Sequence, residues 1–384
     1  MKGVNKENVK KHALNEFLSE YKELNADNKY RPVAVGRYGI RKRESIYSKE
    51  LAKDYSKNKL IHKDTLTVGM GSKQIDIGIL IEDETFAVSP AYHTYEIQGI
   101  RCKYLEYCLQ SKNIEMFSLY AKRGSRQGKS IDLKRWLTYK IPVYSEEDQI
   151  VIEENLNKIN VVIELRRKQL ELLDELVRAR FVEMFGDPVH SEKYGTRKLS
   201  SCVAEKSDMV DGPFGSQVNT KVDYIENGEI PVIRTVNVKM MSFSPTDLKY
   251  MTREKYETVI RSQVLPGDVI LTKVGTIGNV CIFPNTFDEA VLSTTGSCRI
   301  RVDNSVVNTQ FFAYNLMYLK GKLLEIASAG VQPFLNMNHV KNIDILDVSL
   351  EKQKEFADFV KEVDKSRLHE QLAVEYVKLL AKDL

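Results

Sequence analysis

The stretch from Glu146 to Phe185 reads EEDQIVIEENLNKINVVIELRRKQLELLDELVRARFVEMF, with apolar residues at alternating steps of four and three. This is the heptad spacing of a coiled coil, and a helix of this length spans about 60 Å at 1.5 Å per residue. Gly186 and Pro188 follow, as is typical after a helix C-terminus. The pattern predicts one long helix, broken at its seam only by Arg166, with a pairing face formed by Ile152, Leu156, Ile159, Ile163, Leu170, Leu173 and Val177.

A second, less strict pattern of the same kind occupies residues 350–384 at the end of the sequence. We expect it to form a second long helix that pairs with the first in an antiparallel coiled coil. The predicted pairing residues of this helix are Phe356, Val360, Val363 and Leu372.

The two helical segments belong to an internal repeat. Setting Gln149 against Gln353 gives an offset of 353 − 149 = 204, and apolar positions coincide at that offset over much of the upstream sequence. For example, Val88-Ser89 aligns with Leu292-Ser293. A repeat of this length indicates a duplicated domain rather than a solenoid. The sequence therefore predicts two related globular modules, each followed by a long helix, with approximate two-fold internal symmetry.

Each module has the pattern of a mixed α/β (α+β) fold. Short strands are predicted at 32–35, 64–68 and 75–81 in the first module, and at 229–234, 264–272 and 279–283 in the second, each bounded by glycine or proline turns. Helices are predicted at 6–24, 104–120 and 308–329. The resulting domains are 1–145, a central helix at 146–187, 188–348 and a distal helix at 349–384.

The bulk composition restricts the function classes. A chain of 384 residues with 42% hydrophobic residues is long enough for two globular domains, and a formal net charge of +4 is too small to prove a polyanionic partner. The sequence has no apolar run suited to a membrane span, and its charged start is unlike a signal peptide. Five scattered cysteines without a C-x-x-C pair indicate neither disulfides nor a zinc site. We expect a cytoplasmic protein.

The segment GSRQGKS, residues 124–130, is close to a phosphate-binding loop but has three residues between its glycines instead of four. A P-loop also follows a buried strand, whereas this segment follows a helical pattern. Its counterpart at the 204 offset includes Gln332. We interpret both as surface loops, and Arg126, Gln127 and Lys129 are better suited to DNA than to ATP.

Other candidate DNA contacts in the first module lie in short polar loops. Residues 37–43 combine four basic side chains with a tyrosine, a composition suited to phosphates and base edges, although such a run is also typical of a solvated turn. Residues 68–74 hold two close glycines without a dinucleotide fingerprint. A lone histidine at 93 is more often structural than functional. The candidates are Arg37, Arg41, Lys42, Arg43, Ser72, Lys73, Gln74, Tyr92 and His93.

Candidates in the second module lie mainly in the glycine loops at 211–219 and 272–279. Asn and Gln can pair with adenine, and Lys or Arg with guanine or phosphate. The alternative is that Gly275 and Gly278 only turn a hairpin. The candidates are Gln217, Asn219, Arg234, Asn237, Lys273, Thr276, Asn279, Thr294 and Gln332.

No pattern in the sequence indicates a catalytic or metal site. It lacks the Asn/Asp-Pro-Pro-Tyr motif of amino-methyltransferases, the Pro-Asp start of a common nuclease motif, and His/Cys ligand spacing. The Asp-Leu-Lys triplets at 132–134 and 247–249 are too common to carry weight. Any catalysis is expected to come from partners.

Three segments resemble the specificity subunit of type I restriction-modification systems. They are LPGDVILTKVGTIG at 265–278, with LSTT at 292–295, and LELLDELVRARFVEMFGDP at 170–188. The resemblance covers essentially the whole chain as two target-recognition domains and two conserved helices. One departure is that the first domain lacks a clear counterpart of the segment 199–217 that opens the second.

The resemblance implies a non-catalytic reader of double-stranded DNA. Each recognition domain would read one half of a split, asymmetric target, and the helices would act as a spacer that docks two methyltransferase subunits. Those partners would use S-adenosylmethionine, and separate motor subunits would use ATP and Mg²⁺. Two alternatives remain: a coiled-coil scaffold that binds proteins rather than DNA, and a self-contained restriction or methyltransferase enzyme, which the missing motifs disfavour.

Overall fold

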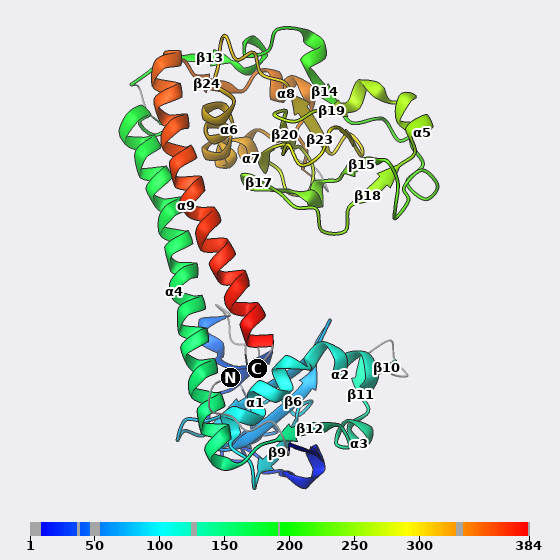
Figure 1. Ribbon diagram of the computed structural model, residues 1–384, viewed down its shortest axis with the longest axis vertical. Coiled ribbons are helices and arrows are strands. Elements are labelled where there is room, and N and C mark those ends of the chain that lie inside the picture. The colour runs from blue at the N-terminus through cyan, green and yellow to red at the C-terminus, as the bar shows by residue number, and fades with distance from the viewer. Residues whose placement is uncertain are drawn as a thin grey trace. The chain divides into compact units, whose positions relative to one another are not determined.

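The computed structural model describes residues 9–36, 39–46, 54–123, 129–190, 193–327 and 333–382 (Figure 1). The chain divides into two compact units. The first extends to Arg167 and also takes the end of the chain from Leu372, while the second is Lys168–Gln371. The division therefore falls inside both long helices, α4 (Glu146–Phe185) and α9 (Leu350–Lys382).

The first unit is built on an antiparallel sheet in the order β2-β9-β6-β7. Apolar side chains at alternate positions of β6 and β7, among them Leu66 and Ile75, are buried in one core with residues of α1 and α2 and with Trp136. The elements before α4 are β1 (Lys10–Ala13), η1 (Leu14–Glu16), β2 (Leu18–Glu20), β3 (Val33–Gly36), β4 (Gly39–Lys42), η2 (Arg43–Ser45), β5 (Lys59–Ile61), β6 (Thr65–Met70), β7 (Ile75–Leu80), β8 (Phe86–Val88), β9 (His93–Ile97), α1 (Cys102–Ser111), α2 (Asn113–Tyr120), β10 (Ala121–Arg123), β11 (Lys129–Ile131), α3 (Leu133–Trp136) and β12 (Lys140–Val143).

The second unit contains two four-stranded sheets, β14-β23-β20-β21 and β18-β15-β22-β19, and the second sheet includes a parallel pair between β15 and β22. Its main core joins the first of these sheets to α6, α7 and the ends of the long helices. The elements are β13 (Thr196–Lys198), η3 (Leu199–Ser201), η4 (Lys206–Asp208), β14 (Met209–Asp211), β15 (Ile230–Ile233), η5 (Thr235–Asn237), β16 (Val238–Lys239), β17 (Ser242–Phe243), β18 (Lys249–Met251), α5 (Arg253–Glu257), η6 (Ile260–Ser262), β19 (Gln263–Val264), β20 (Val269–Thr272), β21 (Val280–Ile282), β22 (Ala290–Leu292), β23 (Ser297–Ile300), α6 (Thr309–Tyr318), α7 (Lys320–Ile326), α8 (Met337–Lys341) and β24 (Asp344–Leu346).

The predicted internal repeat is confirmed element by element. The sheet order β2-β9-β6-β7 corresponds to β14-β23-β20-β21. The first residues of β6, β9, α3, β12 and α4 precede those of β20, β23, α8, β24 and α9 by the same offset that separates Gln149 from Gln353. Asp132 accepts a hydrogen bond at the N-terminus of α3, and Asn336 does the same at α8. The two units therefore share one topology.

The start of the first unit is different from the prediction. The expected helix at 6–24 is absent from its described part, which instead forms β1, η1 and β2, whereas residues 1–8 lie outside the described residues. Leu14 and Leu18 are four apart and buried, which imitates helical spacing, but Leu14 starts a 3₁₀ turn and Leu18 pairs with Ile97.

The first unit does have a counterpart of the segment that opens the second, contrary to the prediction. The backbone N–H of Leu14 donates to the carbonyl of Tyr139, and that of Leu199 donates to the carbonyl of Ile343. Tyr139 and Ile343 correspond at the offset of the repeat, whereas Leu14 and Leu199 are closer together in the chain than that offset. The constant offset is therefore lost at the start of the first unit, which hid the counterpart in the sequence.

Three predicted elements are subdivided. The helix expected at 104–120 is two helices, α1 and α2, separated at Lys112, and the helix expected at 308–329 is α6 and α7, separated at Leu319. The strand expected at 264–272 is β19 and β20, with a turn between them in which Gly267 has a positive φ of 90°. The other predicted strands are present.

The long helices pair in antiparallel directions within the second unit, as predicted (Figure 1). Asp174 of α4 binds Arg367 at 2.6 Å, whereas Arg180, further along α4, binds Glu355, which lies earlier on α9. Phe181 packs on Phe356 with ring centroids 5.3 Å apart. Of the predicted pairing residues, Ile152, Val177, Phe356, Val360 and Val363 are buried, and Leu156, Ile159, Ile163, Leu170 and Leu173 are half-buried.

The prediction that Leu372 belongs to the pairing face is wrong. Its side chain is 60% exposed. The buried face of α9 follows Phe356, Val360 and Val363, and the next step of four reaches Arg367. Leu372 is five residues beyond Arg367, so it falls off that face.

Candidate nucleic-acid interface

Some predicted DNA contacts cannot be placed. Arg37, Arg126, Gln127 and Gln332 lie outside the described residues, and Lys129 is described only as part of the backbone of β11. Of the segment GSRQGKS, the structure describes only residues 129 and 130. They belong to β11, which pairs with β10.

Arg41 and Lys42 belong to β4, which pairs with β3, and Arg43 directly follows this strand. Arg41 and Lys42 are exposed, and Arg43 is half-buried in a short 3₁₀ turn. Lys42 lies 3.6 Å from Glu84 and over the ring of Phe86. The hairpin therefore places cationic side chains on the surface of the first unit, with the charge of Lys42 partly offset.

Residues 72–74 form the turn between β6 and β7, in which Ser72 and Lys73 are exposed and Gln74 is half-buried. Gly69, just before this turn, lies against Tyr92. A Cβ at Gly69 would come within 2.2 Å of the Tyr92 ring, so only glycine permits this packing. The Tyr92 hydroxyl donates to the Val35 carbonyl at 3.0 Å, which fixes the ring.

Tyr92 and His93 line a hollow of about 370 Å³ in the first unit, together with Met70, Ser89 and Ile131. Burial, with a smaller contribution from Lys59, lowers the pKa of His93. At neutral pH His93 is therefore expected to be neutral, with one donor and one acceptor nitrogen.

In the second unit the candidates that remain accessible are Gln217, Asn219, Thr276, Thr294 and Arg234. The first three are exposed, and the last two are half-buried. The Gln217 Oε1 accepts from the backbone N–H of Phe214 at 3.0 Å, and the Asn219 Oδ1 accepts from that of Lys221 at 3.1 Å. The amide NH₂ groups of both side chains make no hydrogen bond with the described residues.

Asn237 and Lys273 are not placed to contact DNA, which corrects the prediction. Asn237 is fully buried, and its amide donates to the carbonyls of Ser244 and Thr246. Lys273 is 3% exposed and forms an ion pair with Asp211. A buried polar group needs such partners, and here both side chains find them inside the unit.

Asn279 is likewise a structural residue. Its amide donates to the Val238 carbonyl at 3.0 Å and accepts from the Lys320 ammonium at 2.8 Å. Gly278 next to it has a positive φ of 79°, so this glycine loop turns a hairpin, which was the alternative interpretation.

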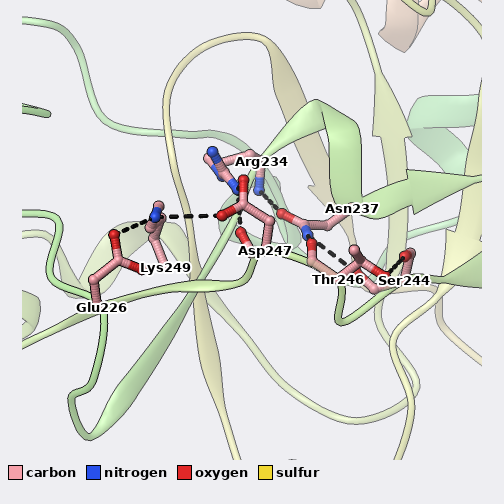
Figure 2. Close-up of polar contacts among 7 residues, drawn as sticks. All are labelled: Glu226, Arg234, Asn237, Ser244, Thr246, Asp247 and Lys249. Atoms are coloured by element: carbon pink, nitrogen blue, oxygen red, sulfur yellow. Dashed lines mark hydrogen bonds and ion pairs between the residues drawn. The ribbon is translucent and has the colours of Figure 1, made fainter. Parts of the chain in front are cut away.

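A charged network surrounds Arg234, as Figure 2 shows. Its Nη2 donates to the Asp247 carboxylate at 2.9 Å and also to the Asp247 carbonyl. Lys249 lies between Asp247, at 3.3 Å, and Glu226, at 2.5 Å. The hydrogen bond from Arg234, followed by that from Lys249, lowers the pKa of Asp247, and Glu226 raises the pKa of Lys249. Asp247 and Lys249 are therefore both charged at neutral pH.

Three members of the network, Glu226, Arg234 and Lys249, line a hollow of about 580 Å³. Its other lining residues are Thr220, Tyr224, Thr235, Val236, Ser293 and Thr294. Tyr224 is anchored by its hydroxyl, which donates to the Ser293 carbonyl at 2.8 Å. Ser293 follows β22, and Ser89 of the other hollow, its counterpart in the repeat, follows β8. Each unit thus has a hollow at the loop after the same strand.

Sequence reasoning missed Tyr224, Glu226, Asp247 and Lys249. The Asp-Leu-Lys triplet at 247–249 is too common to indicate a site, yet the side chains of its first and third residues lie 3.3 Å apart. Asp247 has a positive φ of 54°, which a sequence pattern does not reveal. Glu226 and Tyr224 come from a separate segment, so only folding brings them to Lys249.

Two kinds of feature are absent from the ranges that the structure describes. No three His, Cys, Asp or Glu side chains there form a group that could hold a metal ion. In the same ranges no helix is both long and apolar enough to cross a membrane.

Two related units and a pair of long helices thus make up the described chain. Residues 211–375 match the family model described as the type I restriction modification DNA specificity domain. This matched part of the chain contains the hollow with Arg234.

Two solved structures share the fold over the whole chain at 14% identity. One is the S subunit of a type I restriction-modification system from M. genitalium, with a TM-score of 0.52, covering 100% of this chain and 96% of that one. The other comes from work on complex assembly and conformational transition of the type I R-M system, with a TM-score of 0.55, covering 100% and 97%. The resemblance predicted from the sequence is confirmed.

Proposed function

We propose that the chain is the DNA-specificity subunit of a type I restriction-modification complex. Each unit reads one half of a bipartite, asymmetric DNA target. The observation that carries this proposal is the duplicated unit, because one topology repeated with different surface residues suits two different half-sites. The match of residues 211–375 to a DNA specificity domain supports DNA, rather than protein, as the ligand.

The remaining parts of the complex belong to the same proposal. The chain itself is non-catalytic, and two methyltransferase subunits dock on the units and helices and use S-adenosylmethionine. Motor subunits use ATP and Mg²⁺ for translocation and cleavage. The long helices set the spacing between the half-sites. Such a complex acts on DNA in the cytoplasm.

The test is methylation mapping of DNA from cells that carry this chain together with the methyltransferase subunit of its system. Cells with only the methyltransferase are the control. We expect modified adenine in a split asymmetric motif only when the chain is present. Unchanged methylation in a cell that contains the assembled complex would contradict the proposal, and a symmetric motif would contradict reading by two different units.

A separate binding measurement distinguishes DNA from protein as the ligand. Contacts with phosphates make affinity for duplex DNA fall steeply with salt concentration. We therefore expect strong salt dependence of duplex binding by the complex. A complex that binds no duplex at low salt would favour the scaffold alternative.

A further inference from the structure

The guanidinium of Arg234 lies at the hollow, and only some of its N–H groups donate hydrogen bonds within the fold. Arg234 lines the hollow, and its side chain is 25% exposed. The two bonds to Asp247 both come from Nη2. Among the described residues, Nη1 makes no hydrogen bond, and it carries two N–H groups. The fold therefore holds Nη2 in place and leaves the two N–H groups of Nη1 available to a ligand.

The charge of the surroundings argues against a phosphate as the ligand. Arg234 and Lys249 bring two positive charges, and Asp247 and Glu226 bring two negative charges within 3.3 Å of them. Asp247 is 64% exposed and Glu226 is 79% exposed, so a phosphate approaching the network would meet both carboxylates. A neutral ligand with hydrogen-bond acceptors avoids this repulsion and still satisfies the free donors.

The edge of a DNA base in the major groove is such a ligand. Guanine presents two adjacent acceptors, O6 and N7, whereas adenine presents one acceptor and one donor. Arginine has only donors, so it pairs with guanine and not with adenine. Holding the guanidinium in advance reduces the conformational entropy that is lost when it binds.

Building on the proposed function, we propose that Arg234 reads a guanine in the half-site bound by the second unit. Asp247 is a positioning residue, since it holds Arg234 through the carboxylate and the backbone carbonyl. Lys249 and Glu226 position Asp247 in turn. Arg234 thus determines one base pair of the target rather than general affinity for DNA.

The experiment is selection of bound duplexes from a randomised DNA library by the complete complex, comparing wild type with Arg234→Lys. Lysine keeps the positive charge but loses the planar fork. We expect the preference for one G·C pair to fall about 10-fold to 100-fold, which is the scale of one hydrogen bond from a charged donor. The half of the motif that the first unit reads should not change. Its selection shows, in the same sample, that the complex is assembled.

Asp247→Asn tests the positioning role. It keeps the size of the side chain but weakens its hold on Arg234, so the same base position should relax, by a smaller factor. Because Asp247 is largely exposed, the unfolding midpoint should stay close to that of wild type. A variant that left the motif unchanged would overturn the positioning role, because a purely structural residue does not alter the preference at one base pair.

The matched control is Arg253→Lys. Arg253 is also paired with two acids, Glu229 and Glu289, in the same unit, but it does not line the hollow. The selected motif should be the same as for wild type. Loss of the same G·C preference in this variant would show a general effect of changing arginines and would overturn the assignment to Arg234.

The remaining outcomes separate this inference from the proposed function. If Arg234→Lys selects the wild-type motif unchanged, the guanine assignment is wrong while the specificity role stands. If Arg234→Gln lowers binding equally for all sequences and reduces the salt dependence by about one phosphate contact, Arg234 binds the backbone and the assignment is again wrong. If the wild-type complex selects no motif, the proposed function fails and this inference fails with it.

Discussion

Polar side chains in the loops of the second unit divide into those that build the unit and those that remain available at its surface. Asn237 and Arg234 are three residues apart and hydrogen-bonded to each other through the Arg234 backbone N–H, yet Asn237 is fully buried and Arg234 is not. Asn237 fixes the loop from which Arg234 extends. Replacing Asn237 is therefore expected to lower the stability of the second unit.

We predict that Asn237→Ala destabilises the second unit by about 2 kcal/mol, because the carbonyls of Ser244 and Thr246 lose their donor and the Arg234 N–H loses its acceptor. Asn219→Ala, in an exposed turn of the same unit, is the control and should shift stability by less than about 0.5 kcal/mol. Urea denaturation followed by circular dichroism measures both. Equal shifts for the two variants would contradict the structural role of Asn237.

A second residue-scale prediction concerns pH. The hydroxyl of Tyr256, followed by Arg253, donates to Glu289 and lowers the pKa of its carboxyl below the ordinary value of 4.5. A lowered folded-state pKa stabilises the protein above the unfolded value and loses this contribution as pH falls through the folded value. Glu289→Gln should therefore cost about 1 kcal/mol at pH 7, with a difference from wild type that shrinks below about pH 4.5. Urea midpoints at several pH values test this, and a difference independent of pH would contradict it.

At the scale of elements, a buried glutamine near the start of each long helix bonds to the unit that precedes the helix in the chain. The Gln149 amide donates to the Tyr144 carbonyl at 2.9 Å and accepts from the Arg101 N–H at 3.1 Å. Gln353 donates to the Val348 carbonyl at 2.7 Å and accepts from the Asn308 N–H at 2.8 Å. Arg101 and Asn308 are the N-cap residues of α1 and α6. One buried glutamine thus links the start of a long helix to the start of a shorter one in each unit.

We predict that Gln353→Ala destabilises the second unit by about 1–3 kcal/mol, since it leaves a buried N–H and a carbonyl without partners. Hydrogen exchange should show faster exchange of the Asn308 amide and no change at Arg101. Gln149→Ala is the matched variant in the first unit. It should show faster exchange of the Arg101 amide and no change at Asn308. Gln353→Glu should be intermediate because it keeps the acceptor and loses the donor. Faster exchange in both units from either variant would contradict separate anchoring.

At the scale of the whole molecule, each unit has its own hydrophobic cores. The single tryptophan, Trp136, is fully buried in the core of the first unit. Phe311 is fully buried in the main core of the second unit, against Phe181 and Phe185. Because no buried residue is shared between these cores, tryptophan fluorescence should report on the first unit alone.

We predict that Phe311→Ala costs about 3–5 kcal/mol in the second unit, through loss of buried surface and the cavity that it leaves. Circular dichroism should then show an earlier unfolding step, while the fluorescence transition of Trp136 stays at its wild-type midpoint. Leu324→Ala, at a residue of the same unit that is 51% exposed, is the control. A parallel shift of both signals would mean that the two units unfold as one.

The sequence alone determined the parts of this fold that depend on periodicity and repetition. The bounds of the helix from Glu146 to Phe185 follow from its heptads and from Gly186, and the repeat follows from the constant offset between Gln149 and Gln353. These signals are local or cumulative over many positions, so a single sequence is enough to reveal them. The specificity class followed from the same helical segment.

Tertiary structure alone decided what the individual polar residues do. Asn237, Asn279 and Lys273 had the composition of DNA contacts, but the carbonyls and the carboxylate that bind them come from other segments, so their burial was invisible in the sequence. The same holds for Lys249, whose partner Glu226 lies 23 residues away. Hydrogen bonding of a side chain depends on which distant groups folding brings to it, and spacing along the chain does not encode that directly.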